Sequence, residues 1–242
     1  MENKGELLYR GKAKSAYRSD DPDYLIMEFR DDITAFDGGK KDVLRGKGAY
    51  NAGVSAFFFQ YLGERGIKTH FVRRLDTRTL LVRNLQMIPL EVIVRNVAAG
   101  SIVQRYPIEA GTPLHPPVIV IDYKDDTRHD PMINDDLILA LKILTAEELS
   151  CIRAVSLEIN DLLSKYLADK GLILVDFKME FGRYKGEILL GDELSMDSMR
   201  LWDAKTRESL DKDVYRFEKG DVMKVYASVA ERIAPGAIRG SG

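Results

Sequence analysis

The sequence has few of the residues that build disulfide frameworks and zinc sites. It holds one cysteine, Cys151, and three histidines among 242 residues. A lone cysteine forms no internal disulfide and suits a reducing compartment, and the three histidines lack metal-ligand spacing. No apolar run approaches the roughly 18 residues of a membrane span, and the start of the chain lacks the apolar segment of a secretory signal. We therefore expect a cytoplasmic protein that does not contact a membrane.

A large charge of one sign is also missing. The 36 basic and 38 acidic residues leave a formal net charge of −2. This balance gives no support to a nucleic-acid partner, so any anionic ligand must be met by local basic clusters. With 45% apolar and 31% charged residues, the chain can fill a sizeable core and is not a disordered polymer.

Strand-like segments come before and between the predicted helices. Because hairpins join many of these strands, the pattern favours an α+β fold over a doubly wound parallel sheet. We place a division near residue 87, giving a β-rich part over 1–87 and an α+β part over 88–242. The proline-rich stretch 107–117 is expected to be irregular. The expected helices cover 49–65, 145–170 (with Thr145 and Glu148 as a capping box) and 221–234, and the expected strands lie within 6–30, 68–75, 79–85, 88–95, 172–181 and 187–193.

The strand expected over 172–181 has an apolar face and a charged face, because alternate residues of a strand share a side. The charged side holds a lysine between two carboxylates. A salt-bridged surface strand would show the same pattern. The apolar side carries Val175, Phe177, Met179 and Phe181, and the charged side carries Asp176, Lys178 and Glu180.

A further carboxylate follows the next strand. If the turn at 182–186 is a three-residue loop with Gly186 left-handed, Asp192 shares the face of Lys178; an even-numbered loop would place it on the other side. Carboxylates gathered in this way, here Glu180 and Asp192, suit Mg²⁺, which takes one or two of them together with phosphate oxygens and water.

Two glycine-containing segments are candidates for anion binding. Gly11, Lys12 and Lys14 lie in a predicted hairpin that could approach a phosphate, and an ordinary basic turn would look the same. Within residues 95–105, Arg95, Gly100 and Ser101 follow an apolar strand. The small residues there could form an anion-binding site or could simply allow tight packing, and the sequence favours neither. Two polar loops carry His129 with Asp130 and Asp197 with Arg200.

Several of these segments together resemble one enzyme family. IPLEVIVRNVAAGS (88–101) and LVDFKMEFG (174–182) are similar to the two signature stretches of the SAICAR synthetases, and YRGKAKSAY, HDPMIN and GDELSMDSMRLWD match in the same order. The resemblance implies an ATP-dependent ligase that joins 5-amino-1-(5-phosphoribosyl)imidazole-4-carboxylate (CAIR) to L-aspartate, giving SAICAR, ADP and phosphate in purine biosynthesis. It also implies an α+β fold of two lobes with an ATP cleft between them, related to ATP-grasp enzymes and protein kinases, and a homodimer.

The resemblance also implies a role for each matching residue. Gly11, Lys12 and Lys14 would hold the ATP phosphates, and Glu180 and Asp192 would bind Mg²⁺ beside the nucleotide. The residues expected at the reacting groups are Lys178, Asp176 and Asp130, and those expected to bind CAIR are Arg95, Ser101 and Arg200 at its 5-phosphate, with Gly100, Asp197, Asp37 and His129 nearby.

Two other functions fit parts of the pattern. A kinase-like phosphotransferase could use the same hairpin and carboxylates, but the chain has no H-R-D or D-F-G motif. A regulatory or RNA-binding module would call for a basic stripe rather than paired carboxylates and arginines. The ligase is therefore the favoured prediction.

Overall fold

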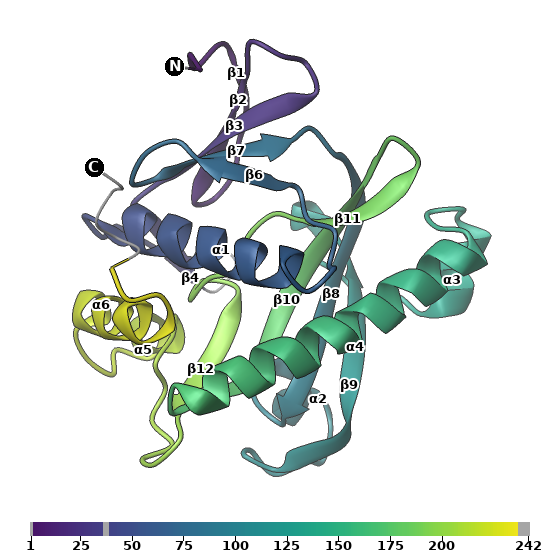
Figure 1. Cartoon of the computed structure of the whole chain (residues 1–242). Coiled ribbons are helices and arrows are strands. Elements are labelled where there is room, and N and C mark those ends of the chain that lie inside the picture. Colours follow the sequence, from purple (N-terminus) through teal and green to yellow (C-terminus); the bar gives the residue numbers. More distant parts are fainter. Residues whose placement is uncertain (1, 36–38, 237–242) are drawn as a thin grey trace.

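Two antiparallel five-stranded sheets form the framework of the computed structural model, which describes residues 2–35 and 39–236 (Figure 1). The first sheet comes from the N-terminal third of the chain, and a small hairpin and a long helix follow its third strand. In spatial order the first sheet contains β1 (Leu7–Arg10), β2 (Lys14–Arg18), β3 (Tyr24–Phe29), β7 (Thr79–Arg83) and β6 (Phe71–Arg74), and the hairpin and helix are β4 (Asp32–Ala35), β5 (Lys40–Val43) and α1 (Lys47–Gly63).

The second sheet contains the segment with the alternating charges. Its central strand pairs with three others, and helices lie along its face and after its last strand. The strands are β11 (Glu187–Gly191), β10 (Leu172–Tyr184), β8 (Gln86–Val97) and β9 (Pro113–Tyr123) in that order, with β12 (Met199–Asp203) also paired to β10; the helices are α2 (Ser101–Arg105), the 3₁₀ turn Asp126–Arg128, α3 (Asp135–Ala140), α4 (Ala146–Asp169), α5 (Asp213–Arg216) and α6 (Val222–Ile233).

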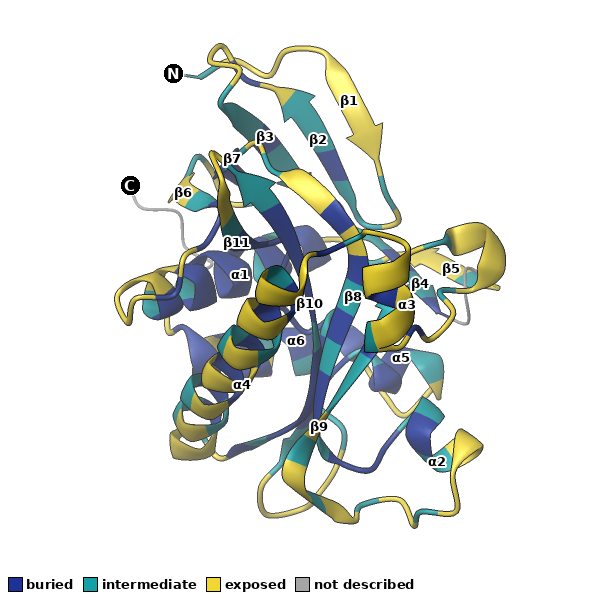
Figure 2. Ribbon diagram, turned by 90° about the vertical axis from the view of Figure 1, so that its right-hand side faces the viewer, coloured by how far each residue is buried: buried dark blue, intermediate teal, exposed yellow. Residues whose placement is uncertain are grey.

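Helix α1 lies between the two sheets and is buried on most sides (Figure 2). Phe58 and Leu62 join the main core with the second sheet, α4 and α6, whereas Ala52 and Ala56 pack against the first sheet. A helix that is apolar all round is expected to be buried in this way. The mixed helix-and-sheet fold is thus confirmed, and the division into 1–87 and 88–242 stays a prediction.

The predicted long helix is confirmed as α4. Thr145 Oγ1 accepts from the Glu148 amide, and Glu148 Oε2 accepts from the Thr145 amide at 2.9 Å, which completes the capping box. The buried stripe of α4 rests on the second sheet and its other side is exposed (Figure 2). No helix in the described part of the chain is long and apolar enough to cross a membrane.

The structure corrects one sequence prediction about the second sheet and decides between two turn lengths that the sequence left open. The stretch 107–117 is not irregular throughout, because β9 begins at Pro113; β9 is an edge strand, where proline is tolerated. Of the two turn lengths considered between β10 and β11, the structure has the even-numbered one. Tyr184 pairs with Glu187, so only Lys185 and Gly186 lie between, both with positive φ as a type I′ turn requires.

Candidate active site

Four charged side chains form a closed cluster on the polar face of the second sheet. Lys178 Nζ donates to Glu91 Oε1 at 2.8 Å and to Glu180 Oε1 at 2.6 Å. Lys124 Nζ donates to the same two oxygens, at 2.9 and 2.7 Å. Glu91 and Glu180 are direct partners in the β8–β10 ladder, which brings their carboxylates together. The charged face predicted for Lys178 and Glu180 is therefore confirmed as a face, and two further members complete it.

This cluster keeps Lys178 protonated. Burial acts to lower the pKa of the Lys178 amine, but Glu180, Asp192 and Glu91 outweigh it and hold the pKa well above 10.5. The two lysines in turn hold the pKa of Glu91 below its ordinary value against the effect of burial. Lys178 is thus a fixed positive charge and not a proton acceptor at neutral pH.

The hairpin between β1 and β2 reaches the second sheet through Lys14. Its Nζ lies 2.5 Å from Asp192 Oδ1 and 2.9 Å from Glu193 Oε1. Burial acts to raise the pKa of Asp192, but the charges of Lys14 and Lys178 lower it well below 3.8. Lys12 Nζ lies 2.8 Å from Asp126 Oδ1. The hairpin therefore faces the carboxylates that end β11.

Asp192 reaches this cluster by a route that the sequence did not suggest. The two-residue turn pairs Glu180 with Gly191, so strict alternation would place Asp192 on the apolar side, with Met179. The strand ends at Gly191, however, and Asp192 has a φ of 55°. This left-handed residue takes the carboxylate out of the ladder and toward Lys14.

Val175 is a second departure from simple alternation. The pairing of β10 with β12 shifts between Leu174 and Asp176, as at a β-bulge. Leu174 packs in the main core together with Phe177, whereas Val175 packs with Val97 in a separate small cluster. The prediction that Val175 shares the face of Phe177 is therefore wrong, because a bulge changes which residues face the core.

The carboxylates suit a hard cation. Among residues 2–35 and 39–236, no three acidic, histidine or cysteine side chains converge as a complete metal site. Mg²⁺ needs only one or two protein carboxylates when phosphate oxygens and water supply the rest. Glu180 is buried and Asp192 is half-buried, and both carry oxygen donors whose partners are lysine amines. Their donor chemistry fits Mg²⁺ arriving with a nucleotide.

A second cluster pairs two arginines across one carboxylate. Asp176 Oδ2 lies 3.0 Å from Arg95 Nη1 and 2.9 Å from Arg200 Nη1. Arg95 Nη2 donates to Ser101 Oγ at 3.0 Å, and Arg95 is only 4% exposed. Gly100 is required here, since its φ is 62° and a Cβ at this position would lie 2.6 Å from Arg200 Nη2. Four predicted CAIR-site residues and Asp176 therefore lie together.

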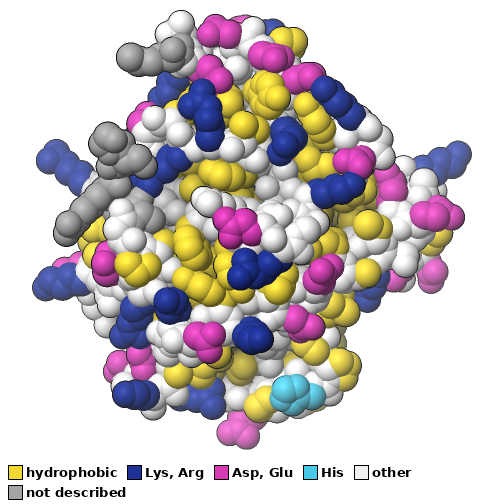
Figure 3. Space-filling view, in the orientation of Figure 1, with side chains coloured by type: hydrophobic (Ala, Val, Ile, Leu, Met, Phe, Trp, Pro, Cys, Tyr) yellow, Lys and Arg dark blue, Asp and Glu magenta, His cyan; other side chains and the backbone are white. Residues whose placement is uncertain are grey.

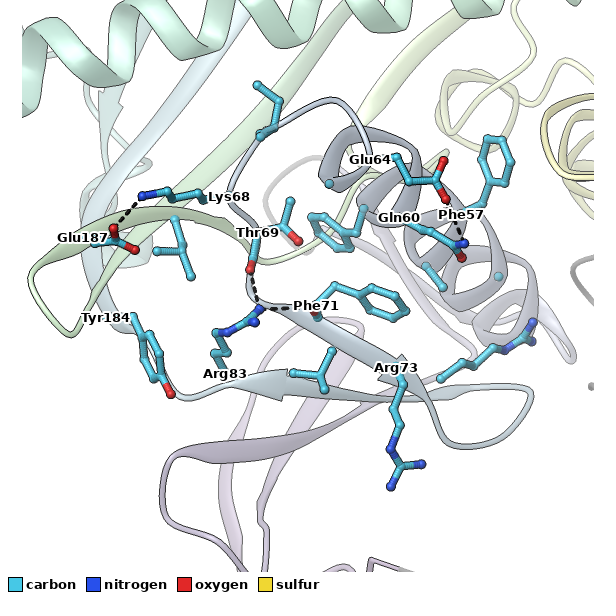
Figure 4. A pocket seen from close by; sticks show the side chains of 18 residues that line it. Phe57, Gln60, Glu64, Lys68, Thr69, Phe71, Arg73, Arg83, Tyr184 and Glu187 are labelled. Atoms are coloured by element: carbon cyan, nitrogen blue, oxygen red, sulfur yellow. Dashed lines mark hydrogen bonds and ion pairs between the residues drawn. The ribbon is translucent and has the colours of Figure 1, made fainter.

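A pocket of about 640 Å³ opens beside the arginine pair. Arg95, Ser101 and Arg105 give it positive charge and a hydroxyl, and Ile102 and Val120 are among its apolar walls. The larger hollow of the chain, about 1020 Å³, lies elsewhere, between α1, β6 and the β10–β11 turn (Figure 4). Of these two pockets, the smaller one borders residues predicted to bind substrate.

Asp197 has partners within the protein. Its Oδ2 lies 2.5 Å from Lys47 Nζ, and its Oδ1 accepts from the Tyr226 hydroxyl at 2.6 Å. Lys47 is fully buried, so this carboxylate joins the start of α1 to α6. That arrangement gives Asp197 a structural role, and substrate contact stays a prediction.

Replacing Tyr226 with phenylalanine is expected to lower the free energy of unfolding by about 1.5–3 kcal/mol at pH 7, the usual range for a hydrogen bond to a charged group. Burial acts to raise the pKa of Asp197, but Lys47 chiefly outweighs it and holds the pKa well below 3.8. Stability from a lowered pKa is present above the ordinary value and is lost as pH falls through the folded value. The difference between wild type and variant should therefore be constant from about pH 5 to 8 and shrink below about pH 4.

Urea unfolding across this pH range measures the effect. Tyr17→Phe is the matched control, because the Tyr17 hydroxyl donates to a half-exposed carboxylate, Glu28, at 3.1 Å. If Tyr226→Phe lowers the free energy of unfolding no more than the control does, the hydrogen bond between Tyr226 and Asp197 does not stabilise the fold as proposed.

The remaining predicted residues lie in loops. Asp130 Oδ1 accepts from the Asp125 amide at 2.8 Å, and this holds the loop after the 3₁₀ turn. His129 precedes it on the exposed side. The contact between Lys12 and Asp126 brings this loop to the tip of the β1–β2 hairpin. Asp37 lies outside the described residues.

Three participants were missed by sequence reasoning. Glu91 shares a strand face with Arg95, a signal that alternation in IPLEVIVR could have given. Lys124 follows β9, and no local pattern marks it. Arg30, which holds the hairpin tip, follows β3 and is visible only through its contacts.

The chain as a whole matches a known protein family. A family model described as SAICAR synthetase matches residues 7–233. The chain belongs to the SAICAR synthetase family. The phosphoribosylaminoimidazole-succinocarboxamide synthase of Methanoculleus marisnigri is 67% identical over 228 residues, which span 94% of this chain and 95% of that protein. That of Methanoregula boonei is 68% identical over 94% of this chain and 89% of its own length.

Solved structures of SAICAR synthetases agree with this assignment. A SAICAR synthetase in complex with ADP superimposes with a TM-score of 0.92 at 51% identity, over 95% of this chain and 97% of that one. The enzyme from Ehrlichia chaffeensis gives 0.93 at 41% identity, over 94% and 98%. As a member of the SAICAR synthetase family the chain is a ligase of purine biosynthesis, and the predicted family and enzyme class are confirmed.

Proposed function

We propose that the two charged clusters form one active site, in which the ligase joins CAIR to L-aspartate at the expense of ATP. The observation that carries the proposal is the placement of β10. Asp176 on this strand bridges Arg95 and Arg200, and Lys178 and Glu180 follow on the same face toward Lys14. One strand thus connects an anion-binding end with a nucleotide end.

ATP would bind between the β1–β2 hairpin and the end of β11. Gly11, Lys12 and Lys14 lie there, and Lys14 already contacts Asp192. Glu180 and Asp192 would hold Mg²⁺, which when bound supplies charge neutralisation for phosphate oxygens. The phosphate oxygens would bind the lysine amines that now pair with these carboxylates.

CAIR would bind with its 5-phosphate on Arg95, Ser101 and Arg200, next to the 640 Å³ pocket. Arginine side chains suit this task because one guanidinium can donate two parallel hydrogen bonds to the oxygens of a phosphate. Gly100 allows the close approach of Arg200, and His129 would contribute from the loop that contacts the hairpin tip through Asp126. The imidazole carboxylate would then point along β10 toward Lys178.

The chemistry needs an activated carboxylate, since resonance and negative charge make a carboxylate a poor acyl donor. Transfer of the terminal phosphoryl group of ATP to the CAIR carboxylate would give an acyl phosphate and ADP, and attack by the aspartate amine would release phosphate. Lys178 would neutralise charge on the transferred group, with its ammonium fixed by Glu91 and Glu180. Asp176 would position the arginines and Asp130 would line the reaction site.

The proposal extends to the lobes, the cellular compartment and the oligomeric state of the enzyme. The two sheets would act as lobes with the ATP cleft between them, in an arrangement related to ATP-grasp enzymes and protein kinases. The enzyme would work in the cytoplasm as a homodimer. The mixture of acidic and basic side chains on the face seen in Figure 3 supports small-molecule substrates over a nucleic-acid partner.

ADP release tests the proposal directly. The purified protein is incubated with ATP and Mg²⁺, adding CAIR and L-aspartate singly and together. We expect ADP and the succinocarboxamide product only when both substrates are present. ADP formed with CAIR alone would indicate acyl-phosphate formation without amine capture. Absence of ADP under every condition, with circular dichroism showing a folded protein, would contradict the proposal and favour a binding module.

A further inference from the structure

Arg30, the residue that follows strand β3, contacts the backbone of the β1–β2 hairpin tip at several points. Arg30 Nη2 donates to the carbonyl oxygens of Gly11 and Lys12 at 2.8 and 3.2 Å, and Nη1 donates to that of Lys14 at 2.6 Å. The Arg30 amide donates to the Ala13 carbonyl at 2.7 Å. All four carbonyls of the turn are therefore directed at Arg30.

The guanidinium is itself fixed in place. Its Nε donates to Asp32 Oδ2 at 2.8 Å, and Nη1 also donates to Ser15 Oγ at 2.7 Å. The adjacent Asp31 accepts from the Gly48 amide at the start of α1. The backbone that carries Arg30 is thus tied to β4 and to α1, so the hairpin tip is tied to them as well.

The contacts between Arg30 and the carbonyls of residues 11–14, called the clamp below, affect ligand binding through the geometry of the peptide bond. In a trans peptide the carbonyl and the following N–H point in opposite directions. Because the carbonyls of Gly11 and Lys12 point at Arg30, the amides of Lys12 and Ala13 point away from it. Successive amides that point outward from one turn form a concave site for an anion.

We propose that Arg30 is a positioning residue that sets the hairpin for the nucleotide phosphates, with the amides of Lys12 and Ala13 and the amine of Lys14 presented together. This inference rests on the proposed use of the hairpin for ATP. Arg30 acts through the backbone and contacts no reacting atom. Positive charge alone does not suffice for this role, because one guanidinium serves three carbonyls, a hydroxyl and a carboxylate in fixed directions, and a lysine amine does not match that fork.

The test compares Arg30→Ala and Arg30→Lys with matched changes at Arg18. Arg18 is the last residue of β2, the strand that leaves the hairpin tip, but its side chain is 60% exposed and its guanidinium lies 3.7 Å from the Glu6 carboxylate. Two quantities are measured: hydrogen exchange of the amides of residues 11–15 without nucleotide, and the KM values for ATP and CAIR.

Both Arg30 variants are expected to speed exchange of these amides about tenfold and to raise the KM for ATP at least about tenfold, as a misplaced binding group does. The KM for CAIR should change less than about twofold, because CAIR binds at the other end of β10. Arg18 variants should match wild type in all three measurements. Equal KM increases for both substrates would indicate general destabilisation and overturn the inference.

Three further results would overturn it. Wild-type exchange in both Arg30 variants would show that the clamp does not hold the turn. Full recovery in Arg30→Lys would show that charge alone acts. Faster exchange with an unchanged KM for ATP would show that Arg30 does not position the hairpin for ATP. The Lys14→Ala variant then separates two causes. If the KM for ATP rises in Lys14→Ala, the hairpin binds ATP without help from Arg30; if that KM is also unchanged, the proposed ATP site is wrong.

Discussion

Replacing Glu180 with glutamine is expected to lower kcat at least about 100-fold, the loss typical of removing one electrostatic stabiliser of a transition state. The substitution keeps the shape of the side chain and removes its charge. In the proposed site that charge holds Mg²⁺ together with Asp192 and orients Lys178 and Lys124, both of which donate to Glu180 Oε1. Loss of the charge therefore affects the metal and both lysines at once.

Steady-state kinetics with varied Mg²⁺ measures this effect. Glu187→Gln is the matched control: Glu187 lies on the neighbouring strand β11, is 55% exposed and pairs with Lys68. We expect the control to have wild-type kcat, and Glu180→Gln to need more Mg²⁺ for its residual activity. A variant with full kcat at ordinary Mg²⁺ would show that Glu180 is not a metal ligand.

The stability of the same variant needs a separate measurement. Glu180 is 5% exposed and its partners are two amines. Glutamine leaves these amines with Glu91 as their shared carboxylate, so some destabilisation is expected. Circular dichroism and the thermal midpoint should show a folded enzyme at assay temperature, which separates a lost metal site from a lost fold.

Patterns within one segment predicted their structures well. The capping box at Thr145 and Glu148 identified the start of α4, and alternation in β10 identified the face that carries Lys178 and Glu180. These signals depend only on neighbours three or two residues apart, which the backbone geometry of a helix or strand brings together. The resemblance to SAICAR synthetases then supplied the substrates, which no periodicity could supply.

Positions that depend on a turn or a bulge were predicted less well. The sequence left the length of the β10–β11 turn open; the structure has the even-numbered loop, and a left-handed Asp192 nevertheless brings its carboxylate to Lys14. The bulge at Leu174–Asp176 reversed the face of Val175. One extra residue changes every side chain beyond it, so alternation fails at these places.

Contacts between distant segments could not be read from one segment at all. Glu91, Lys124 and Arg30 each join a site through residues more than ten positions away in sequence, and only the pairing of strands places them there. The same holds for Asp197, whose predicted place in the site gave no sign of its buried partners Lys47 and Tyr226.

Replacing Asp176 with asparagine is expected to lower the free energy of unfolding by about 3–5 kcal/mol, the cost of removing one partner from a buried ion pair. Asp176 is 4% exposed and bridges Arg95 and Arg200. Without it, two guanidinium groups lie close together, and Arg200 still pairs with Asp213. For a chain of this length the thermal midpoint should fall by about 6–20 °C.

The same variant tests whether the arginine pair binds the CAIR phosphate. Inorganic phosphate should raise the thermal midpoint of Asp176→Asn more than that of wild type, because an anion between the guanidiniums replaces the lost charge. The KM for CAIR should rise about tenfold while the KM for ATP stays within about twofold, since the arginines lose their alignment and the hairpin does not.

Asp161→Asn is the control for these measurements. Asp161 is exposed on α4 and lies away from both charged clusters, so its thermal midpoint and KM values should match wild type. If Asp176→Asn also matches wild type in midpoint, the bridge contributes nothing to stability. If the midpoint falls but phosphate protects both proteins equally and the KM for CAIR is unchanged, the arginine pair is a structural element and the CAIR phosphate binds elsewhere. A lower thermal midpoint in Asp176→Asn, together with a larger phosphate-induced rise than in wild type, would show that the Asp176 carboxylate stabilises both arginines at a site that binds phosphate.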